Sequence, residues 1–264
     1  MKARPSFPAR LGDSVTSGTP VVTRPKPQTL VSTTPKKTPT VQASPVSMGL
    51  GLDSGAVRAQ MVAKLAAQGV QDPFVLQAMG WVERHRFVET ALAAQAYEDT
   101  SLPIGFGQTI SKPNVVARMI ELLREGAEGK LGRILEIGTG CGYQAAVLSR
   151  VATEVYSIER LRGLHEKAKK NLLHCRLPNV HLLFGDGMLG FAKGAPYAGI
   201  ISAAGGDDVP QAWLDQLAVG GRLVAPTATA GGQQALVVIH KTKDGIERRV
   251  LEPVHFVPLK SGIA

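Results

Sequence analysis

The sequence predicts an α/β fold with a largely parallel sheet, antiparallel C-terminal strands and an N-terminal helical elaboration. A short apolar run at 134–137 is followed by Gly138, Gly140 and Gly142 and then by a helix-like segment. Apolar runs of strand length alternate with amphipathic segments after this turn, and two strand-like segments without a helix between them end the chain. Alternation of this kind is typical of doubly wound sheets, and the final pair predicts an antiparallel edge.

The first predicted elements are helices, in a helical part that covers about 54–125. Val57, Met61 and Leu65 are spaced to lie on one helix face, and Gly69 is a typical residue for ending such a helix. This part therefore precedes the sheet as an N-terminal helical elaboration.

The second helix begins at Asp72 and Pro73, and a loop-rich region and the turn-rich segment 102–111 follow it. We expect Ser111 to cap the next helix, because Pro113 then falls in its first turn. A run of apolar residues after Pro113 supplies the buried face of that helix.

After the glycine turn, strands and helices are expected to alternate along the sheet. The expected elements are a strand at 154–158, a helix at 161–175, strands at 180–184 and 198–202, a helix at 213–217, and strands at 221–225, 235–240 and 248–256.

The net charge of +9 is unevenly distributed along the 264 residues. Residues 1–53 contain seven Lys or Arg, two acidic residues and eight of the 17 prolines, with almost no aromatic residues. A segment of this composition cannot bury enough apolar surface to fold, so we expect a disordered basic tail at 1–53 and a folded domain at 54–264. A transit peptide is the weaker interpretation, since the prolines interrupt any amphipathic helix. Because the charge lies mostly in the tail, it is weak support for nucleic-acid binding by the domain.

Composition also limits the setting of the protein. No apolar run approaches the roughly 20 residues of a membrane span, and no apolar signal segment follows Met1. Cys141 and Cys175 are the only cysteines, which favours a reduced, cytoplasmic location and argues against a disulfide or a zinc site. We expect no metal, no membrane or nucleic-acid partner, and a monomer.

Polar residues and glycines recur where successive strands of the predicted sheet end. The turn at Gly138 lets a ligand approach bare backbone at a helix N-terminus. Glu159 ends the next strand, where a carboxylate can accept hydrogen bonds from ribose hydroxyls, and Asp186-Gly187 ends the third, where it suits an adenine amine. Taken singly, Glu159 could be a helix-start acid and Asp186 part of a simple turn. Together they predict a nucleoside site.

The glycine spacing distinguishes between nucleoside ligands. A dinucleotide site favours glycine at the sixth position of its motif, where this chain has Tyr143, and no phosphate-binding loop of the G-x-x-x-x-G-K-[ST] form is present. The pattern E-x-G-x-G-x-G that starts at Glu136 and includes Thr139 is instead the form seen in S-adenosylmethionine-dependent methyltransferases.

Several motifs together resemble the protein-L-isoaspartate O-methyltransferase family, from about Ala63 to the C-terminus. They are Leu-Pro-Ile-Gly-Phe-Gly-Gln-Thr-Ile-Ser-Lys-Pro at 102–113, Leu-Glu-Ile-Gly-Thr-Gly-Cys-Gly-Tyr-Gln at 135–144, Ser-Ile-Glu-Arg at 157–160, Gly-Asp-Gly at 185–187, Ala-Pro-Tyr at 195–197 and Val-Pro-Leu at 257–259. The resemblance implies a class I S-adenosylmethionine-dependent methyltransferase (Rossmann-like) fold with S-adenosyl-L-methionine as cofactor. It also implies methylation of the free α-carboxylate of L-isoaspartyl residues in damaged proteins and peptides. The ester then recloses to a succinimide, which begins repair.

The resemblance also implies the site residues. The cofactor contacts carried over are Gln108, Thr109, Ile110, Ser111, Glu136, Gly138, Thr139, Gly140, Gly142, Glu159, Asp186 and Gly187. Ser111 matches the family's active-site serine. Because a carboxylate is already ionised at neutral pH, no general base is needed, and we expect Ser111 to orient the substrate rather than to act as a nucleophile. The alternative is that Ser111 only caps its helix.

Some residues depart from the family's usual pattern, mostly on the substrate side. They are Phe106, Cys141, Met188, Phe191, Ala198, Gly205 and Gly206. These departures raise the alternative of a catalytically silent cofactor-binding protein. A nucleic-acid methyltransferase is a further alternative, but Ser-Ala-Ala-Gly-Gly at 202–206 stands where amino-methylating enzymes need Asn/Asp-Pro-Pro-aromatic.

Overall fold

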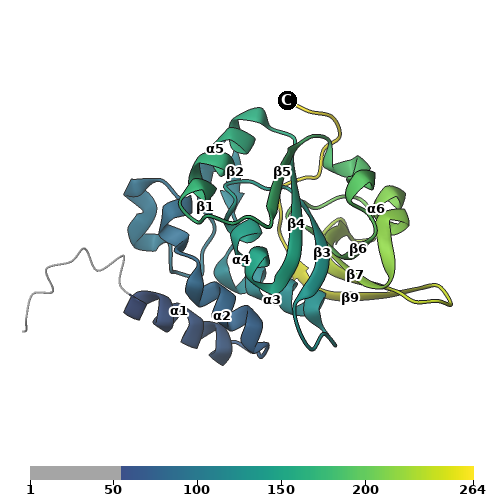
Figure 1. The fold of residues 1–264 in the computed structure, drawn as a ribbon, viewed down its shortest axis with the longest axis horizontal. Coiled ribbons are helices and arrows are strands. Elements are labelled where there is room, and N and C mark those ends of the chain that lie inside the picture. Colours follow the sequence, from purple (N-terminus) through teal and green to yellow (C-terminus); the bar gives the residue numbers. More distant parts are fainter. Residues whose placement is uncertain (1–54) are drawn as a thin grey trace, which may run out of the picture. The chain divides into compact units, whose positions relative to one another are not determined.

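The structure, a computed structural model, describes residues 55–264 (Figure 1). The expectation of a disordered tail at 1–53 lies outside the described residues. The strands are β1 (Leu102–Gly105), β2 (Gln108–Ile110), β3 (Leu131–Ile137), β4 (Ala152–Glu159), β5 (Val180–Phe184), β6 (Tyr197–Ser202), β7 (Leu217–Ala228), β8 (Gln234–Lys241) and β9 (Ile246–Val254). The helices are α1 (Gly55–Ala67), α2 (Pro73–Trp81), α3 (Pro113–Arg124), α4 (Tyr143–Val151), α5 (Arg162–Leu173) and α6 (Gln211–Gln216), with short 3₁₀ helices η1 (Arg84–Phe87), η2 (Thr90–Gln95), η3 (Gly187–Leu189) and η4 (Ala192–Gly194).

Seven strands form one sheet in the order β5-β4-β3-β6-β7-β8-β9 (Figure 1). Strands β3 to β7 are parallel, whereas β8 pairs antiparallel with both β7 and β9, which confirms the predicted antiparallel end of the sheet. The chain runs outward from β3 to β4 and β5 on one side and returns to β6 on the other. The carboxyl end of β3 is therefore the point at which the strand order reverses, where open α/β sheets bind ligands.

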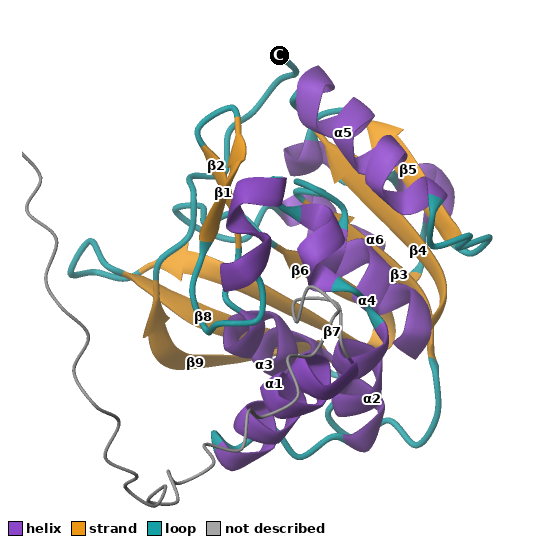
Figure 2. Cartoon of the chain, turned by 90° about the vertical axis from the view of Figure 1, so that its left-hand side faces the viewer, coloured by secondary structure: helices purple, strands orange, loops and turns teal. Residues whose placement is uncertain are grey.

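Residues of β3 and β6 alternate between the two faces of the sheet, as the pleat requires. Ile134 and Ile201 pack with α3, α4 and α5, which lie together on one face (Figure 2), while Leu135 and Ile200 pack with Trp213 of α6 on the other. Both faces of the parallel region are thus covered, which explains why its strands read as continuous apolar runs.

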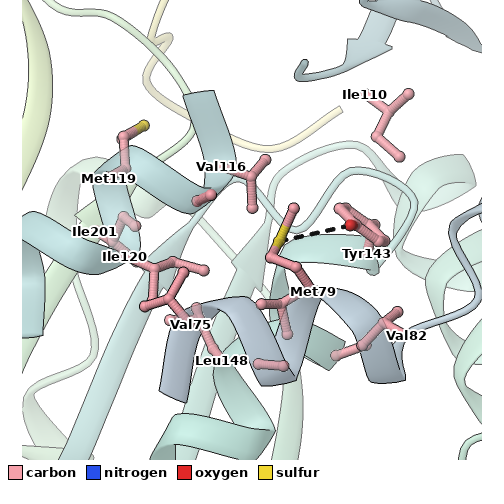
Figure 3. Close-up of a cluster of buried hydrophobic side chains, with 14 of the residues drawn as sticks. Val75, Met79, Val82, Ile110, Val116, Met119, Ile120, Tyr143, Leu148 and Ile201 are labelled. Carbon is pink, nitrogen blue, oxygen red and sulfur yellow. Dashed lines mark hydrogen bonds between the residues drawn. The ribbon is translucent and has the colours of Figure 1, made fainter. Parts of the chain in front are cut away.

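The N-terminal helices pack against α4. Met79 of α2, Val116 and Ile120 of α3, and Tyr143 and Leu148 of α4 share one buried cluster (Figure 3). The Tyr143 hydroxyl donates to the sulfur of Met79 over 3.7 Å. The predicted N-terminal helices therefore hold α4, the helix that follows the glycine turn, in place.

The sequence predicted the N-terminal cap of α2 correctly but not that of α3. Asp72 caps α2, and its Oδ1 accepts hydrogen bonds from the amides of Phe74 and Val75. The prediction that Ser111 caps α3 is wrong, because α3 begins at Pro113 and Lys112 occupies the cap position without a side-chain hydrogen bond.

Asp99, earlier in the chain, takes the place that was expected for Ser111 at the start of α3. The first free amide of α3 belongs to Asn114, and it donates to the carboxylate of Asp99 over 2.9 Å. Ser111 is left outside the helix, at the end of the antiparallel β1–β2 hairpin, which the sequence indicated only as a turn-rich segment. Its hydroxyl is thereby available for another role.

Within residues 55–264 no helix has both the length and the apolar character needed to cross a membrane.

Candidate functional site

A cavity of about 410 Å³ opens at the carboxyl ends of β3 and β4, where the strand order reverses. Its lining includes Gly138 and Gly140 of the glycine turn together with Ile158 and Glu159. The remaining walls come from the β1–β2 hairpin, the start of α5, the loop after β6 and the C-terminal segment: Ile104, Phe106, Gly107, Gln108, Thr109, Ile137, Arg160, Leu161, Leu164, Gly187, Ala203, Ala204, Val257, Pro258, Leu259 and Lys260. A volume of this size is typical of small-molecule sites.

The glycine turn depends on left-handed backbone at three positions. Gly138, Gly140 and Gly142 have φ values of +87°, +58° and +91°, which L-residues with a side chain rarely adopt. The amides of Gly138 and Thr139 donate to the carbonyl of Ile158 over 2.9 and 3.1 Å, which ties the turn to β4. Gly138 and Gly140 therefore present bare backbone to the cavity, whereas Gly142 precedes α4 outside the residues that line it.

Glu159 is held rigidly at the wall of the cavity. It is only 5% exposed, and its two carboxylate oxygens accept hydrogen bonds from the amides of Gly140 (2.8 Å) and Leu161 (2.9 Å). An ionised carboxylate has about four lone-pair positions, so it can also accept from two adjacent hydroxyl groups. This arrangement fits a ribose whose 2′ and 3′ hydroxyls face Glu159.

Glu136 lies beneath the turn, outside the set of residues that line the cavity. Its Oε2 accepts a hydrogen bond from the hydroxyl of Ser157, which shares a further 2.6 Å hydrogen bond with Thr139. Its Oε1 is buried without a hydrogen-bond partner. Burial raises the pKa of Glu136 to about 8. The hydroxyl of Ser157 and the side-chain amide of Gln144 oppose this, and the nearby Glu159 adds the smallest effect, in the raising direction. The structure thus gives Glu136 and Thr139 a supporting position under the turn.

Asp186 faces backbone amides of its own chain rather than the cavity. Its Oδ1 accepts from Met188 (2.9 Å) and its Oδ2 from Gly262 (2.6 Å). The C-terminal segment is also joined to the start of α5, since the amide of Arg162 donates to the carbonyl of Ala264 over 2.8 Å. Of the predicted Asp-Gly pair, only Gly187 lines the cavity, and the role of Asp186 toward adenine stays a prediction.

A second cavity, of about 650 Å³, adjoins the first and contains Ser111. Thr109, Ala203 and Val257 line both cavities, so they mark the boundary between them. Within residues 55–264, the Ser111 hydroxyl has no hydrogen-bond partner. Lys112 also lines the second cavity, and none of the described residues that line it is acidic.

The predicted contacts of the hairpin fall in different places. Gln108 and Thr109 line the first cavity, and Ser111 lines the second. Ile110 is 4% exposed and belongs to the hydrophobic core, so its side chain faces away from both. Alternation along a strand places Ile110 opposite its two neighbours.

The sequence analysis missed Arg84, which is completely buried between the helical part and the site. Its Nη2 donates to the carbonyl of Ser111 and its Nε to that of Ala96, both over 2.7 Å, and its guanidinium lies 4.7 Å from the ring centre of Tyr143. Burial lowers the pKa of Arg84. Glu83, Arg84, His85 and Arg86 all stand between Val82 and Phe87, so no signal in the sequence distinguishes Arg84 from its polar neighbours.

Titratable side chains elsewhere suggest no metal centre. Within residues 55–264 no group of three or more His, Cys, Asp and Glu side chains could hold a metal ion. Cys141 and Cys175 are both free thiols, so the described part of the chain contains no disulfide.

Comparison with known proteins identifies the family of the chain. A sequence profile described as protein-L-isoaspartate(D-aspartate) O-methyltransferase (PCMT) matches residues 56–264. The chain belongs to this family. Family membership confirms the resemblance seen in the sequence and the predicted enzyme class.

Individual relatives support the same assignment. The protein-L-isoaspartate O-methyltransferase of Methylibium petroleiphilum is 61% identical over 217 residues, which are 81% of each chain. The one from Cupriavidus pinatubonensis is 58% identical over 79% of this chain and 74% of its own. Neither match covers the whole of this chain.

Solved structures confirm the predicted fold. A protein-L-isoaspartate O-methyltransferase structure has a TM-score of 0.70 at 29% identity and covers 78% of this chain and 67% of its own. A Plasmodium falciparum structure described as a putative enzyme of this type, in complex with S-adenosyl-L-homocysteine, has a TM-score of 0.65 at 24% identity over 77% of this chain and 98% of its own. At that identity the second match bears on the fold alone.

Proposed function

We propose that the first cavity holds the cofactor of this enzyme, S-adenosyl-L-methionine, and that the second holds the isoaspartyl residue of a damaged protein or peptide. The observation that carries this proposal is that the two cavities adjoin at Thr109, Ala203 and Val257, with Ser111 on the second side. A methyl group delivered at this boundary reaches a carboxylate held beside Ser111. The reaction is methylation of the free α-carboxylate, which precedes closure to the succinimide and repair.

The donors and acceptors of the first cavity suit this cofactor. Glu159 is fixed where it can accept from both ribose hydroxyls, and the turn at Gly138 and Gly140 leaves room for the amino-acid part. Ile158 and Leu164 supply apolar walls for the adenine ring. The bound cofactor supplies an electrophilic methyl group on a sulfonium centre.

The residues of the second cavity suit an anionic nucleophile. A terminal-type carboxylate has a pKa of roughly 3.5 and needs no general base at neutral pH. The hydroxyl of Ser111 can donate a hydrogen bond to one carboxylate oxygen and so direct the other toward the first cavity. Lys112 adds a positive charge to a cavity without acidic lining residues. Orientation of this kind can supply roughly 7–11 kcal/mol of the rate enhancement.

We further propose a monomeric, cytoplasmic enzyme. The free thiols of Cys141 and Cys175 suit a reducing compartment. Light scattering of the purified protein tests the monomer, and fractionation of the native host tests the compartment.

Two substitutions test the roles of the Ser111 hydroxyl and the Glu159 carboxylate. Ser111→Ala is expected to lower kcat on an isoaspartyl peptide by about a hundredfold, as loss of one orienting donor does in comparable sites, with the Kd for S-adenosylhomocysteine unchanged. Glu159→Gln is expected to raise that Kd by about tenfold to a hundredfold, because it weakens charge-assisted hydrogen bonds. Ser101→Ala is the matched control, since Ser101 is a serine that lines the same cavity as Ser111.

The proposal fails if Ser111→Ala behaves like Ser101→Ala in a correctly folded protein, or if the unsubstituted protein does not bind S-adenosylhomocysteine. The same assay with the normal aspartyl peptide, DNA and RNA measures the substrate class, and transfer to nucleic acid in preference to the isoaspartyl peptide would refute the assignment of the second cavity.

A further inference from the structure

The tip of the β1–β2 hairpin has an unusual backbone. Gly105, Phe106 and Gly107 have φ values of +92°, +55° and +68°, so three consecutive residues are left-handed. For the two glycines this is an ordinary conformation. For Phe106 it is disfavoured, since a left-handed L-residue with a large side chain is strained by crowding of its Cβ atom.

Burial in the hydrophobic core does not explain why a phenylalanine occupies this position. Phe106 is 63% exposed and belongs to neither of the two buried apolar clusters. A turn with the same backbone is formed more readily by glycine or asparagine. Backbone strain at a residue that is mostly exposed is typical of residues that act on a ligand.

The surroundings of the ring indicate which ligand it faces. Phe106 lines the first cavity together with Glu159 and Leu164, and it is absent from the lining of the cavity that contains Ser111. The ring lies over Gly163 in the first turn of α5, where a Cβ atom would overlap the ring carbons. The bare backbone of Gly163 therefore makes space for the ring beside the cavity.

Helix α5 also fixes the strand that leads to the tip. The ammonium group of Lys167 donates to the carbonyl of Ile104 over 2.9 Å. Two contacts four residues apart on one helix, Gly163 with the ring and Lys167 with the strand, thus set the position of Phe106.

We propose that Phe106 is a cofactor-binding residue whose ring covers the adenosine part of S-adenosylmethionine, and that the lack of a side chain at Gly163 leaves the space that the ring occupies. The inference rests on the proposed function of the first cavity and adds a contact that the predicted site did not include. An aromatic ring against a purine ring contributes stacking beyond the burial of its area, so the ring slows release of the cofactor product.

The test is a double-mutant cycle on the Kd for S-adenosylhomocysteine, measured by calorimetry with the full chain. Phe106→Ala is expected to raise the Kd about fivefold to tenfold. Gly163→Ala is expected to raise it by a similar factor by displacing the ring, and to have no effect in the Phe106→Ala background. Gly163 has no left-handed φ value and lies in a helix, so alanine there favours folding. Leu173→Ala is the control, because Leu173 is a 73% exposed apolar residue of the same helix.

Three results would overturn the inference. One is an unchanged Kd in Phe106→Ala, and another is an equal effect of Gly163→Ala in both backgrounds, which would show that Gly163 acts through α5. The third is a raised KM for the isoaspartyl peptide with an unchanged Kd for S-adenosylhomocysteine, which would place the ring on the substrate. Failure of the proposed function is distinguishable, because then the unsubstituted protein itself does not bind S-adenosylhomocysteine.

Discussion

Replacing Glu136 by glutamine removes one proton-binding group from beneath the glycine turn without changing the size of the side chain. Glu136 is 0% exposed, one of its oxygens has no partner, and burial raises its pKa to about 8. In the unfolded chain the same carboxyl ionises near its ordinary value of 4.5. Between these two pH values the folded protein holds a proton that the unfolded chain has lost.

The sign and size of the effect follow from this difference. Because the folded state binds more protons in this window, the free energy of unfolding falls as the pH rises toward 8 and levels off above it. A shift from 4.5 to about 8 corresponds to about 5 kcal/mol in total, at about 1.4 kcal/mol per pH unit. About 2 kcal/mol of this is lost between pH 6 and pH 8. Glu136→Gln should therefore gain about 2 kcal/mol relative to the unsubstituted protein over the same interval.

Urea unfolding at several pH values between about 6 and 8 measures this difference. The matched control is Glu128→Gln, since Glu128 is exposed and makes no hydrogen bond or ion pair within the described residues. The reasoning is refuted if the stability difference between Glu136→Gln and the unsubstituted protein is constant across this range, because Glu136 would then be ionised in the folded state as well.

Two further substitutions test the packing around the site. Asp72→Ala should lower the free energy of unfolding by about 4 kcal/mol, because it removes a helix cap and leaves the fully buried guanidinium of Arg124, 2.8 Å from Asp72, without its carboxylate. Urea unfolding measures this loss, and a loss equal to that of Asp72→Asn would show that the charge contributes nothing. Gly142→Ala should cost about 2 kcal/mol, since the residue has a φ of +91° and a Cβ atom would lie 3.1 Å from Leu172. Thermal unfolding measures it, and a melting temperature equal to that of the unsubstituted protein would contradict the strain argument.

The sheet and the turn were predictable from sequence because their signals are local. Buried parallel strands read as apolar runs, as at Ile134 and Leu135, and the left-handed backbone at Gly138 requires glycine at a fixed distance from the strand end. The antiparallel final strands were predictable because no helix pattern separates them. Resemblance to a family added the cofactor and the substrate, which periodicity alone does not specify.

The errors and omissions arise where distant residues decide the outcome. Ser111 was expected to cap α3, but Asp99 supplies the acceptor for the first free amide, 15 residues upstream of Asn114. The role of Asp186 toward adenine stays a prediction, and the structure adds a partner that the sequence did not indicate, the amide of Gly262, 76 residues away. Neither partner can be read from the residues next to the motif.

Glu136 illustrates a different limit. The motif fixes its place in the chain, and the strand pattern alone does not decide whether its side chain faces the ligand or the space beneath the turn. The hydrogen bond from Ser157 of the neighbouring strand and the exclusion of solvent place it beneath the turn. A motif residue in such a position supports the ligand site through its neighbours.

The contact of Arg84 with Ser111 spans 27 positions of the chain and joins the helical part to the proposed substrate site. The same guanidinium lies against Tyr143, the first residue of the helix behind the glycine turn. In a chimera that joins this sheet to the helices of a distant relative, the glycine turn and the first cavity should therefore form correctly. Ser111 should be displaced unless the helices also carry an arginine at the position of Arg84.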